Sequence, residues 1–360
     1  MRSLEEFRKT LHQNPELSGV EYETQEKIRL ELDTLQRVQY FKVAQTGLLA
    51  WIEGTRNGPR LLLRADIDAL PITEVNNFDY QSRNEGISHK CGHDGHATSL
   101  LGAVRHFDQN PPDGGILYFL FQPAEETGQG AASVLRDKKF KKLSIDEVYA
   151  YHNLPGYTLG EVVTIPNRFS AGVISAAFTF TGHTSHAAEP EHGINPAEAI
   201  SKVLLESRQL ENLDPQGEDF TLVTPIYAQW GEKAYGTAAG KGEIHFTIRA
   251  WESGHLDNTR VELQRLNQEQ ARKYGLELEE AWFEEFRPTQ NLPNSVEQVK
   301  KAAQALDFAH QELDQAFRWG EDFGLFTQHY GGAMFGLGSG VEQPALHHPA
   351  YNYPDELLEN

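Results

Sequence analysis

The chain has 360 residues, more than one hydrophobic core usually holds, so two domains are expected. Its formal net charge of −20 disfavours nucleic acids and anionic membranes as partners, and no apolar run is long enough to span a membrane. The N-terminal segment lacks the apolar stretch of a secretory signal, so we expect a cytoplasmic location. The single cysteine, Cys91, excludes a disulfide within the chain.

The first part of the chain alternates helical periodicity with apolar runs. Helices are predicted at residues 4–17 and 21–36, at 96–107 and within 125–137, and strands at 46–54, 59–72, 114–123 and 145–153. Two of these strands are almost continuously apolar, which is typical of a sheet covered on both sides. The alternation predicts an α/β fold with an open, mostly parallel sheet.

From about Ser170 the pattern changes to partial period-two alternation, which is typical of an antiparallel sheet with one solvated face. The half-buried strands and amphipathic helices of this part are predicted at residues 171–185, 195–210, 240–251 and 255–275. The C-terminal part returns to helix and buried strand. We therefore expect an α/β domain of residues 1–169 and 286–360, with a smaller α+β domain of residues 170–285 inserted into it.

The segment around Cys91 concentrates groups that bind metals. Cys91 and His93 are two residues apart, a spacing that lets both side chains point the same way on a loop but not on a helix. Two neighbouring glycines favour such a loop, just ahead of a helix. The pair suits metal ligation, although Cys91 could also be a buried apolar residue or a nucleophile. His89 and His96 are expected to be structural.

Two adjacent glutamates, Glu125 and Glu126, follow an apolar strand, where solvated surface is not expected. One interpretation is a helix N-terminus that gathers acidic residues. The other is a division of labour, in which one carboxylate binds metal and the other, at a raised pKa, takes a proton from water. The sequence alone leaves both interpretations open.

Further histidines also come just after predicted strands, namely His152 and the neighbours His347 and His348. A single histidine in such a loop is more often merely hydrogen-bonded. Here, however, the cysteine, the histidines and the glutamates would all gather at the carboxyl ends of one sheet, where open α/β folds bind ligands. Thiolate, imidazole and carboxylate together suit zinc, or manganese, cobalt or nickel.

Two aspartates lie on one face of the strand that ends near residue 68. Asp68 would orient a ligand histidine from behind, a common device in metal sites. Asp66 is explained at least as well by a salt bridge with Arg64 or by a turn.

Taken in order, these motifs resemble the metal-dependent aminoacylase and carboxypeptidase family, and especially its branch of hippurate hydrolases, indole-acetyl-amino-acid hydrolases and N-acetyl-diaminopimelate deacetylases. The similarity runs through nearly the whole chain, in the segments "LHQNPELSGVEYET", "LRADIDALP", "HKCGHDGHAT", "FQPAEETGQGA", "GHTSHAAEPEHGINPAEAI", "GEDFGLFT" and "ALHHP". The resemblance implies a catalytic domain with two divalent metal ions. It also implies an inserted lid domain that often mediates dimerisation, and therefore a homodimer.

The resemblance also implies a role for individual residues of this chain. The positions that match the metal ligands are Cys91, His93, Glu126, His152 and His347. In that pattern the thiolate takes the place of a carboxylate that bridges the two ions. Glu125 matches the general base and Asp68 its orienting carboxylate, while His186 matches a lid histidine that approaches the scissile carbonyl.

One position departs from the family pattern. Gly236 stands where the lid usually has a substrate-binding asparagine, so an unusual substrate preference is expected. Arg249 could bind a substrate carboxylate, because a guanidinium matches that group bidentately, or could form a salt bridge within the lid.

The function predicted from the sequence is hydrolysis of the amide bond of small N-acyl amino acids. The alternatives are a dipeptidase or aminopeptidase with the same metal site, and a catalytically silent binding protein that keeps the fold. A cysteine hydrolase with Cys91 as nucleophile is disfavoured, because His93 is better used as a ligand than as the base for the thiol.

Overall fold

The computed structural model describes residues 2–358 of the chain, and they form two compact units. The first unit comprises the chain up to Phe169, Thr289–Ala316 and the part from Glu321 onward. The second comprises Ser170–Pro288 and the short segment Phe317–Gly320. Within that segment, the Phe317 carbonyl accepts a hydrogen bond from the backbone N–H of Ala171 at 2.9 Å.

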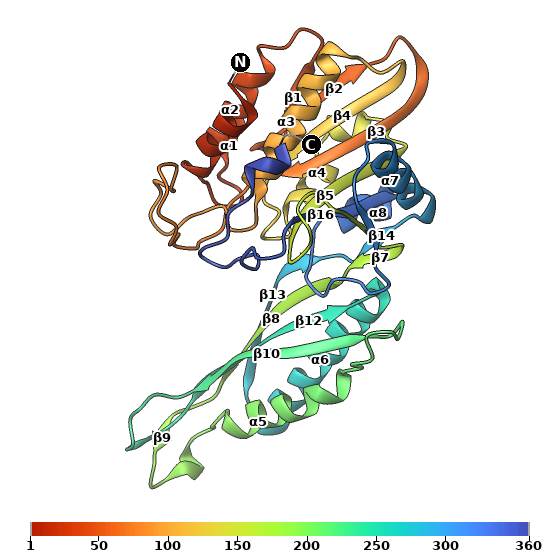
Figure 1. Cartoon of the computed structure of the whole chain (residues 1–360). Coiled ribbons are helices and arrows are strands. Elements are labelled where there is room, and N and C mark those ends of the chain that lie inside the picture. Colours follow the sequence, from red (N-terminus) through yellow and green to blue (C-terminus); the bar gives the residue numbers. More distant parts are fainter. Residues whose placement is uncertain (1, 359–360) are drawn as a thin grey trace. The chain divides into compact units, whose positions relative to one another are not determined.

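An eight-stranded sheet forms the centre of the first unit, in the order β1-β2-β4-β3-β5-β16-β6-β15 (Figure 1). Its strands are β1 (Gln39–Val43), β2 (Gly47–Glu53), β3 (Arg56–Asp66), β4 (Gly114–Gln122), β5 (Glu147–Pro155), β6 (Val162–Thr164), β15 (His310–Glu312) and β16 (Gly332–Gly340). The four central strands β4, β3, β5 and β16 pair in parallel, whereas β1, β2 and β6 introduce antiparallel pairs toward the two ends. The expected mainly parallel α/β sheet is confirmed.

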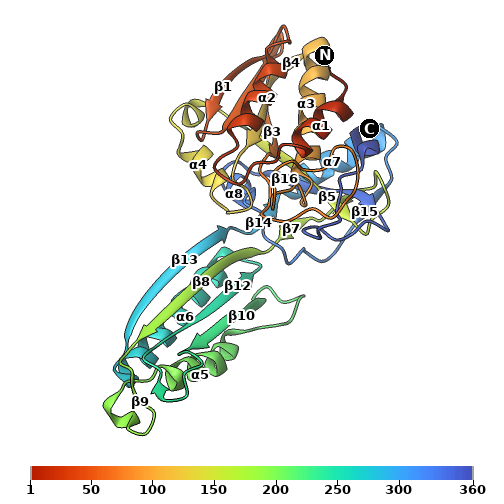
Figure 2. The same cartoon turned by 90° about the vertical axis from the view of Figure 1, so that its left-hand side faces the viewer.

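Helices cover both faces of this sheet (Figure 2). On one face, α1 (Leu4–His12), α2 (Tyr22–Leu32) and α3 (His93–Gln109) pack against β2 and β4, and α7 (Pro293–Ala305) packs against β6 and β16. The short helices α4 (Gly130–Arg136) and α8 (Gly324–Tyr330) cover the other face. Two 3₁₀ turns, Phe140–Lys142 and Asp355–Leu358, complete the unit.

The helices bordering the predicted site differ from expectation at their starts. Helix α3 begins three residues early, at His93, because Gly92 adopts a left-handed φ of 94° that turns the chain into the helix. Helix α4 begins only at Gly130, so Glu125 and Glu126 lie in the preceding turn and not at a helix N-terminus.

The second unit is built on a four-stranded antiparallel sheet in the order β10-β12-β8-β13. Its strands are β8 (Gly172–Thr181), β10 (Thr221–Trp230), β12 (Lys241–Ala250) and β13 (Glu277–Phe286). Helices α5 (Ala197–Glu206) and α6 (Ser253–Tyr274) pack on the sheet, around a core that includes Phe178, Phe180, Ile244, Phe246 and Leu263. The alternating burial along β12 is the period-two pattern read from the sequence, and the predicted antiparallel α+β fold is confirmed.

Short elements complete the description. They are the pairs β7 (Asn167–Ser170) with β14 (Thr289–Asn291) and β9 (Ser185–His186) with β11 (Thr237–Ala238), and the 3₁₀ turns Pro190–His192 and Ser207–Leu210. Across residues 2–358, none of the helices combines the length and apolarity that crossing a membrane requires.

A buried network of ion pairs and hydrogen bonds joins α1 to the start of α3 and to the loop ahead of it. Arg8 donates to Asp94 at 3.0 Å, and the two ring nitrogens of His12 lie 2.8 Å from Asp94 and 2.9 Å from Glu74. Glu74 also accepts a hydrogen bond from Lys90. Burial alone would raise the pKa of Glu74, but the hydrogen bonds from His12 and Lys90 lower it to about 2.

This shift predicts a pH-dependent contribution to stability. Because the folded-state pKa of Glu74 lies below the ordinary value of 4.5, its carboxylate stabilises the fold above pH 4.5, and the contribution is lost as the pH falls toward 2. We expect Glu74→Gln to lower the free energy of unfolding of the metal-free protein by about 1–3 kcal/mol at pH 7 and by clearly less at pH 3. Urea unfolding at both pH values, with the exposed Glu85→Gln as control, checks this. An equal loss at both pH values would contradict it.

Candidate metal centre

The parallel strands bring several predicted site residues to one edge of the first unit's sheet. Asp68 follows β3, Glu125 and Glu126 follow β4, His152 lies toward the end of β5, and His347 lies in the loop after β16. These four strands are parallel neighbours, so their carboxyl ends meet. Residues far apart in the sequence thereby become neighbours.

The turn that carries Cys91 and His93 packs tightly against β5. A Cβ atom added at Gly92 would lie 2.3 Å from Oδ1 of Asn153, and the left-handed φ there also favours glycine. The turn therefore places the Cys91 thiol just before α3 and His93 in its first turn, both buried beside the strand ends.

Two groups of metal-binding side chains meet at the thiol of Cys91. One consists of Cys91, His93 and His152, and the other of Cys91, Glu126 and His347, with the donor atoms of each group within 4.8 Å of one another. Because the two groups share Cys91, they have the composition expected for two ions with a common thiolate ligand.

Hydrogen bonds fix the tautomers of two of these histidines. Nδ1 of His93 lies 3.0 Å from the carbonyl oxygen and 3.3 Å from the carboxylate of Asp68. Nδ1 of His152 lies 2.9 Å from the carbonyl oxygen of Asn153. Oxygens of this kind only accept, so each Nδ1 carries a proton, and in the neutral ring that binds a metal Nε2 is the nitrogen with the lone pair. Nε2 of His152 faces Sγ of Cys91 at 3.5 Å.

The electrostatics of the cluster fit bound cations. Within residues 2–358, Nε2 of His93 and Oε1 of Glu126 are buried without a hydrogen-bond partner. Burial raises the pKa of Glu126 to about 8, and burial together with nearby carboxylates raises the pKa of the Cys91 thiol well above its ordinary value. A divalent cation would reverse both shifts and engage the unpartnered atoms, so these residues fit a two-ion centre.

Glu125 lies beside this centre in a strongly acidic, buried environment. One carboxylate oxygen accepts the backbone N–H of Asp322 at 3.4 Å. Burial and the negative charges of Glu321 and Glu126 raise the pKa of Glu125 well above its ordinary value. A raised pKa makes a carboxylate a stronger base, which is the property that a proton acceptor for water needs.

The surroundings of Glu125 were not assigned a role from the sequence. Arg64 is fully buried and pairs with Asp66 at 2.6 Å, Glu321 at 2.9 Å and Asp322 at 2.8 Å. The signal available was the acidic pair in "GEDFGLFT", next to an arginine inside an apolar strand. The salt bridge between Asp66 and Arg64, one of the readings for Asp66, is present.

Other nearby histidines take no part in the two donor groups around Cys91. His96 has both nitrogens engaged, since Nδ1 lies 2.6 Å from Asp66 and Nε2 accepts the backbone N–H of Asn153 at 3.2 Å. His89 is buried, and burial lowers its pKa to about 4. His348 is exposed and accepts the backbone N–H of Ala350.

Two predicted site residues belong to the second unit. His186 lies in β9, pairs with Thr237 of β11 and is exposed. Next to it, the carbonyl of Gly236 accepts the N–H of Ala187, and a Cβ at Gly236 would meet nothing within 4 Å. Arg249 lies in β12 and donates to a main-chain carbonyl, that of Arg318, at 3.2 Å.

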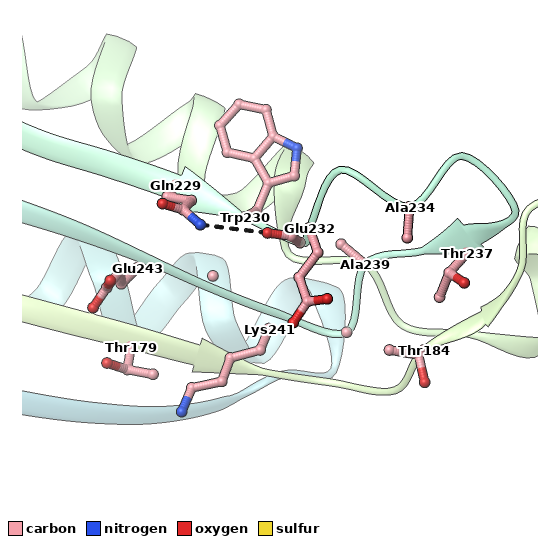
Figure 3. A pocket seen from close by; sticks show the side chains of 13 residues that line it. Thr179, Thr184, Gln229, Trp230, Glu232, Ala234, Thr237, Ala239, Lys241 and Glu243 are labelled. Atoms are coloured by element: carbon pink, nitrogen blue, oxygen red, sulfur yellow. Dashed lines mark hydrogen bonds between the residues drawn. The ribbon is translucent and has the colours of Figure 1, made fainter.

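A groove of about 510 Å³ borders the pair of strands β9 and β11 in the second unit (Figure 3). Figure 3 shows Thr184, next to β9, and Thr237, in β11, at one end of the groove. Trp230, Glu232 and Lys241 also line it. Gln229, another lining residue, donates a hydrogen bond to the Gly231 carbonyl at 3.5 Å. None of its polar lining side chains is buried, so the groove is a surface feature.

Comparison with known proteins agrees with this architecture. Residues 62–360 match the family described as peptidase family M20/M25/M40. An uncharacterized hydrolase of Staphylococcus aureus is 32% identical over 361 residues, covering 98% of this chain and 94% of the relative, and one of Staphylococcus haemolyticus is 31% identical with 98% and 93% covered.

A solved structure extends the likeness to three dimensions. The YXEP protein of Bacillus subtilis, described as a dinuclear metal-binding peptidase of the M20 family, superimposes with a TM-score of 0.81 at 28% identity. The alignment covers 99% of this chain and 93% of that structure. The chain therefore belongs to the M20/M25/M40 peptidase family and is a metal-dependent hydrolase.

Proposed function

We propose that the protein is an amidohydrolase that uses two divalent metal ions to cleave the amide bond of N-acyl amino acids. The observation that carries the proposal is the pair of donor groups that share Cys91, with the buried Glu125 beside them. The B. subtilis relative, described as dinuclear, supports the count of two ions. The proposed ligands are Cys91, His93, Glu126, His152 and His347.

The chemistry divides between the ions and the chain. Bound zinc or manganese, or cobalt or nickel, would polarise the substrate carbonyl and make water more acidic. Glu125 takes the proton from the attacking water and later hands it to the leaving amine. Asp68 holds the proton of His93 on Nδ1, which leaves Nε2 to bind an ion, and is itself held by the Ser18 hydroxyl at 2.6 Å and the Glu126 N–H at 3.0 Å.

We assign the catalytic role to residues 1–169 and 286–360, and the role of a lid to residues 170–285. In this assignment His186 stabilises the oxyanion, and Arg249 binds the substrate carboxylate, for which its guanidinium has the right geometry. Gly236 stands where the family pattern has an asparagine, and its carbonyl accepts the N–H of Ala187, next to His186; this replacement supports an unusual substrate preference.

A peptidase acting on dipeptides or free N-termini is the second candidate. It is favoured by the description of the B. subtilis relative as a peptidase. Both candidates use the same metal centre and the same base, and they differ only in whether the substrate carries a free amine. A silent binding protein is disfavoured, because every proposed ligand and Glu125 are present.

Glu125→Gln tests the proposed chemistry. Amino-acid release is measured from a panel of N-acyl amino acids and dipeptides with added manganese or zinc. We expect the wild type to cleave N-acyl amino acids, and Glu125→Gln to lose about 10²- to 10⁴-fold in kcat while keeping its metal content, because only the proton acceptor is removed. Glu85→Gln, an exposed glutamate, is the matched control. Unchanged kcat in Glu125→Gln would contradict the assignment, and cleavage of dipeptides alone would favour the second candidate.

The two edges of the second unit's sheet support a homodimer. Edge strand β13 carries five glutamates, a pattern that blocks pairing with another strand. The other edge strand, β10, has no charged residue and exposes Ile226, Tyr227 and Trp230. We therefore propose that two copies associate through their β10 edges.

The dimer is tested by placing a charge on the apolar edge. We expect the wild type to have twice the 40.5 kDa chain mass in sedimentation experiments, and Ile226→Lys to dissociate into 40.5 kDa monomers because a buried unpaired ammonium is costly. Glu280→Lys on β13 should remain dimeric. A wild type of 40.5 kDa, or a dimeric Ile226→Lys, would contradict the proposal.

A further inference from the structure

Among the five proposed metal ligands, His347 is by far the most exposed. Its side chain is 52% exposed, and its backbone φ of 65° lies in the left-handed region. A non-glycine residue stays in that region only when its surroundings hold it there. The contacts of the segment that follows therefore decide whether Nε2 of His347 stays near Glu126, whose carboxylate is 3.7 Å away.

Lys90 holds this segment at two points. Its carbonyl oxygen accepts the backbone N–H of His347 at 2.8 Å, and its Nζ donates to the carbonyl of Tyr351 at 2.8 Å. The lysine side chain is fully buried, and the residue directly precedes Cys91. One residue thus ties the Cys91 turn to the loop that carries His347.

The loop of residues 74–76 strengthens the same attachment. Oδ1 of Asn76 accepts a hydrogen bond from Lys90 at 2.8 Å, while its Nδ2 donates to the carbonyl of Ala350 at 3.0 Å. The N–H of Val75 donates to the carbonyl of Pro349 at 3.3 Å. All three hydrogens of the ammonium have acceptors once Glu74 is included, so the lysine has little freedom to move.

The charge of Lys90 is balanced inside the protein. Glu74 pairs with it and is held in turn by His12 at 2.9 Å and by the N–H of Ser82 at 2.8 Å. A buried ion pair is weak evidence for stability, because apolar side chains of similar volume often serve as well. Apolar side chains, however, could not make the directional hydrogen bonds that Lys90 makes here.

We propose that Lys90, assisted by Asn76, is a positioning residue that clamps the His347 loop onto the metal centre. The inference rests on the proposed two-metal function and assigns the clamp to one ion. It sets the affinity for the ion shared by Glu126 and His347, and leaves the ion held by His93 and His152 unchanged.

Cobalt(II) titration of the metal-free protein tests the clamp. Visible absorption follows the cobalt sites, and elemental analysis after dialysis counts the ions. Lys90→Met removes the ammonium and keeps the stem; we expect one ion to bind as in the wild type and the other about 10- to 100-fold more weakly. Lys27→Met, which removes a half-buried surface lysine paired with Glu23, should bind both ions as the wild type does.

Further variants keep the test decisive. Asn76→Ala should likewise weaken only one of the two ions, and it carries the test if Lys90→Met does not fold. Lys90→Met with Glu74→Gln should behave like Lys90→Met, because the clamp and not the leftover carboxylate is responsible.

The proposal is overturned if folded Lys90→Met binds both ions like the wild type, or loses affinity for both alike. A wild type that binds fewer than two ions overturns the proposed function and the clamp together. A wild type that binds two ions but cleaves nothing overturns the function alone, and the titration still decides the clamp.

Discussion

The burial of one thiol between two sets of imidazole and carboxylate groups is the constraint on which the rest of the site depends. Cys91 lies within reach of His93 and His152 on one side and of Glu126 and His347 on the other. Without cations, burial holds protons on the thiol and on Glu126 by raising their pKa values. The arrangement is therefore suited to binding cations. The parallel sheet creates it, because the carboxyl ends of four neighbouring strands meet there.

Two buried, positively charged side chains pair with carboxylates around this acidic site. Arg64 balances Asp66, Glu321 and Asp322, which lie next to the proposed base. Lys90 balances Glu74 and reaches the loop of His347. In both places a fixed positive charge lets carboxylates be buried near the centre without occupying the ligand positions.

The sequence predicted the fold and the residues of the metal centre well. It did not predict the residues that hold those side chains in place. The parallel centre followed from the alternation of apolar strands and helices. Cys91 lies on the predicted loop, whereas His93, expected on the same loop, is the first residue of α3. The antiparallel pairing of β1, β2 and β6 did not follow, because short strands take their direction from tertiary contacts. Lys90 and Glu321 were missed since charged residues are usually exposed, and only the fold reveals the partners that let them be buried. The roles of His186 and Arg249 remain predictions from the resemblance.

The central claim is that one thiolate serves two metal ions in each chain. X-ray absorption spectroscopy on protein loaded with two equivalents of cobalt, beside Cys91→Ser, tests it most directly. The account predicts a sulfur ligand on both ions in the wild type and on neither in the variant. Two bound ions without sulfur in the wild type would contradict it, as would sulfur on one ion alone.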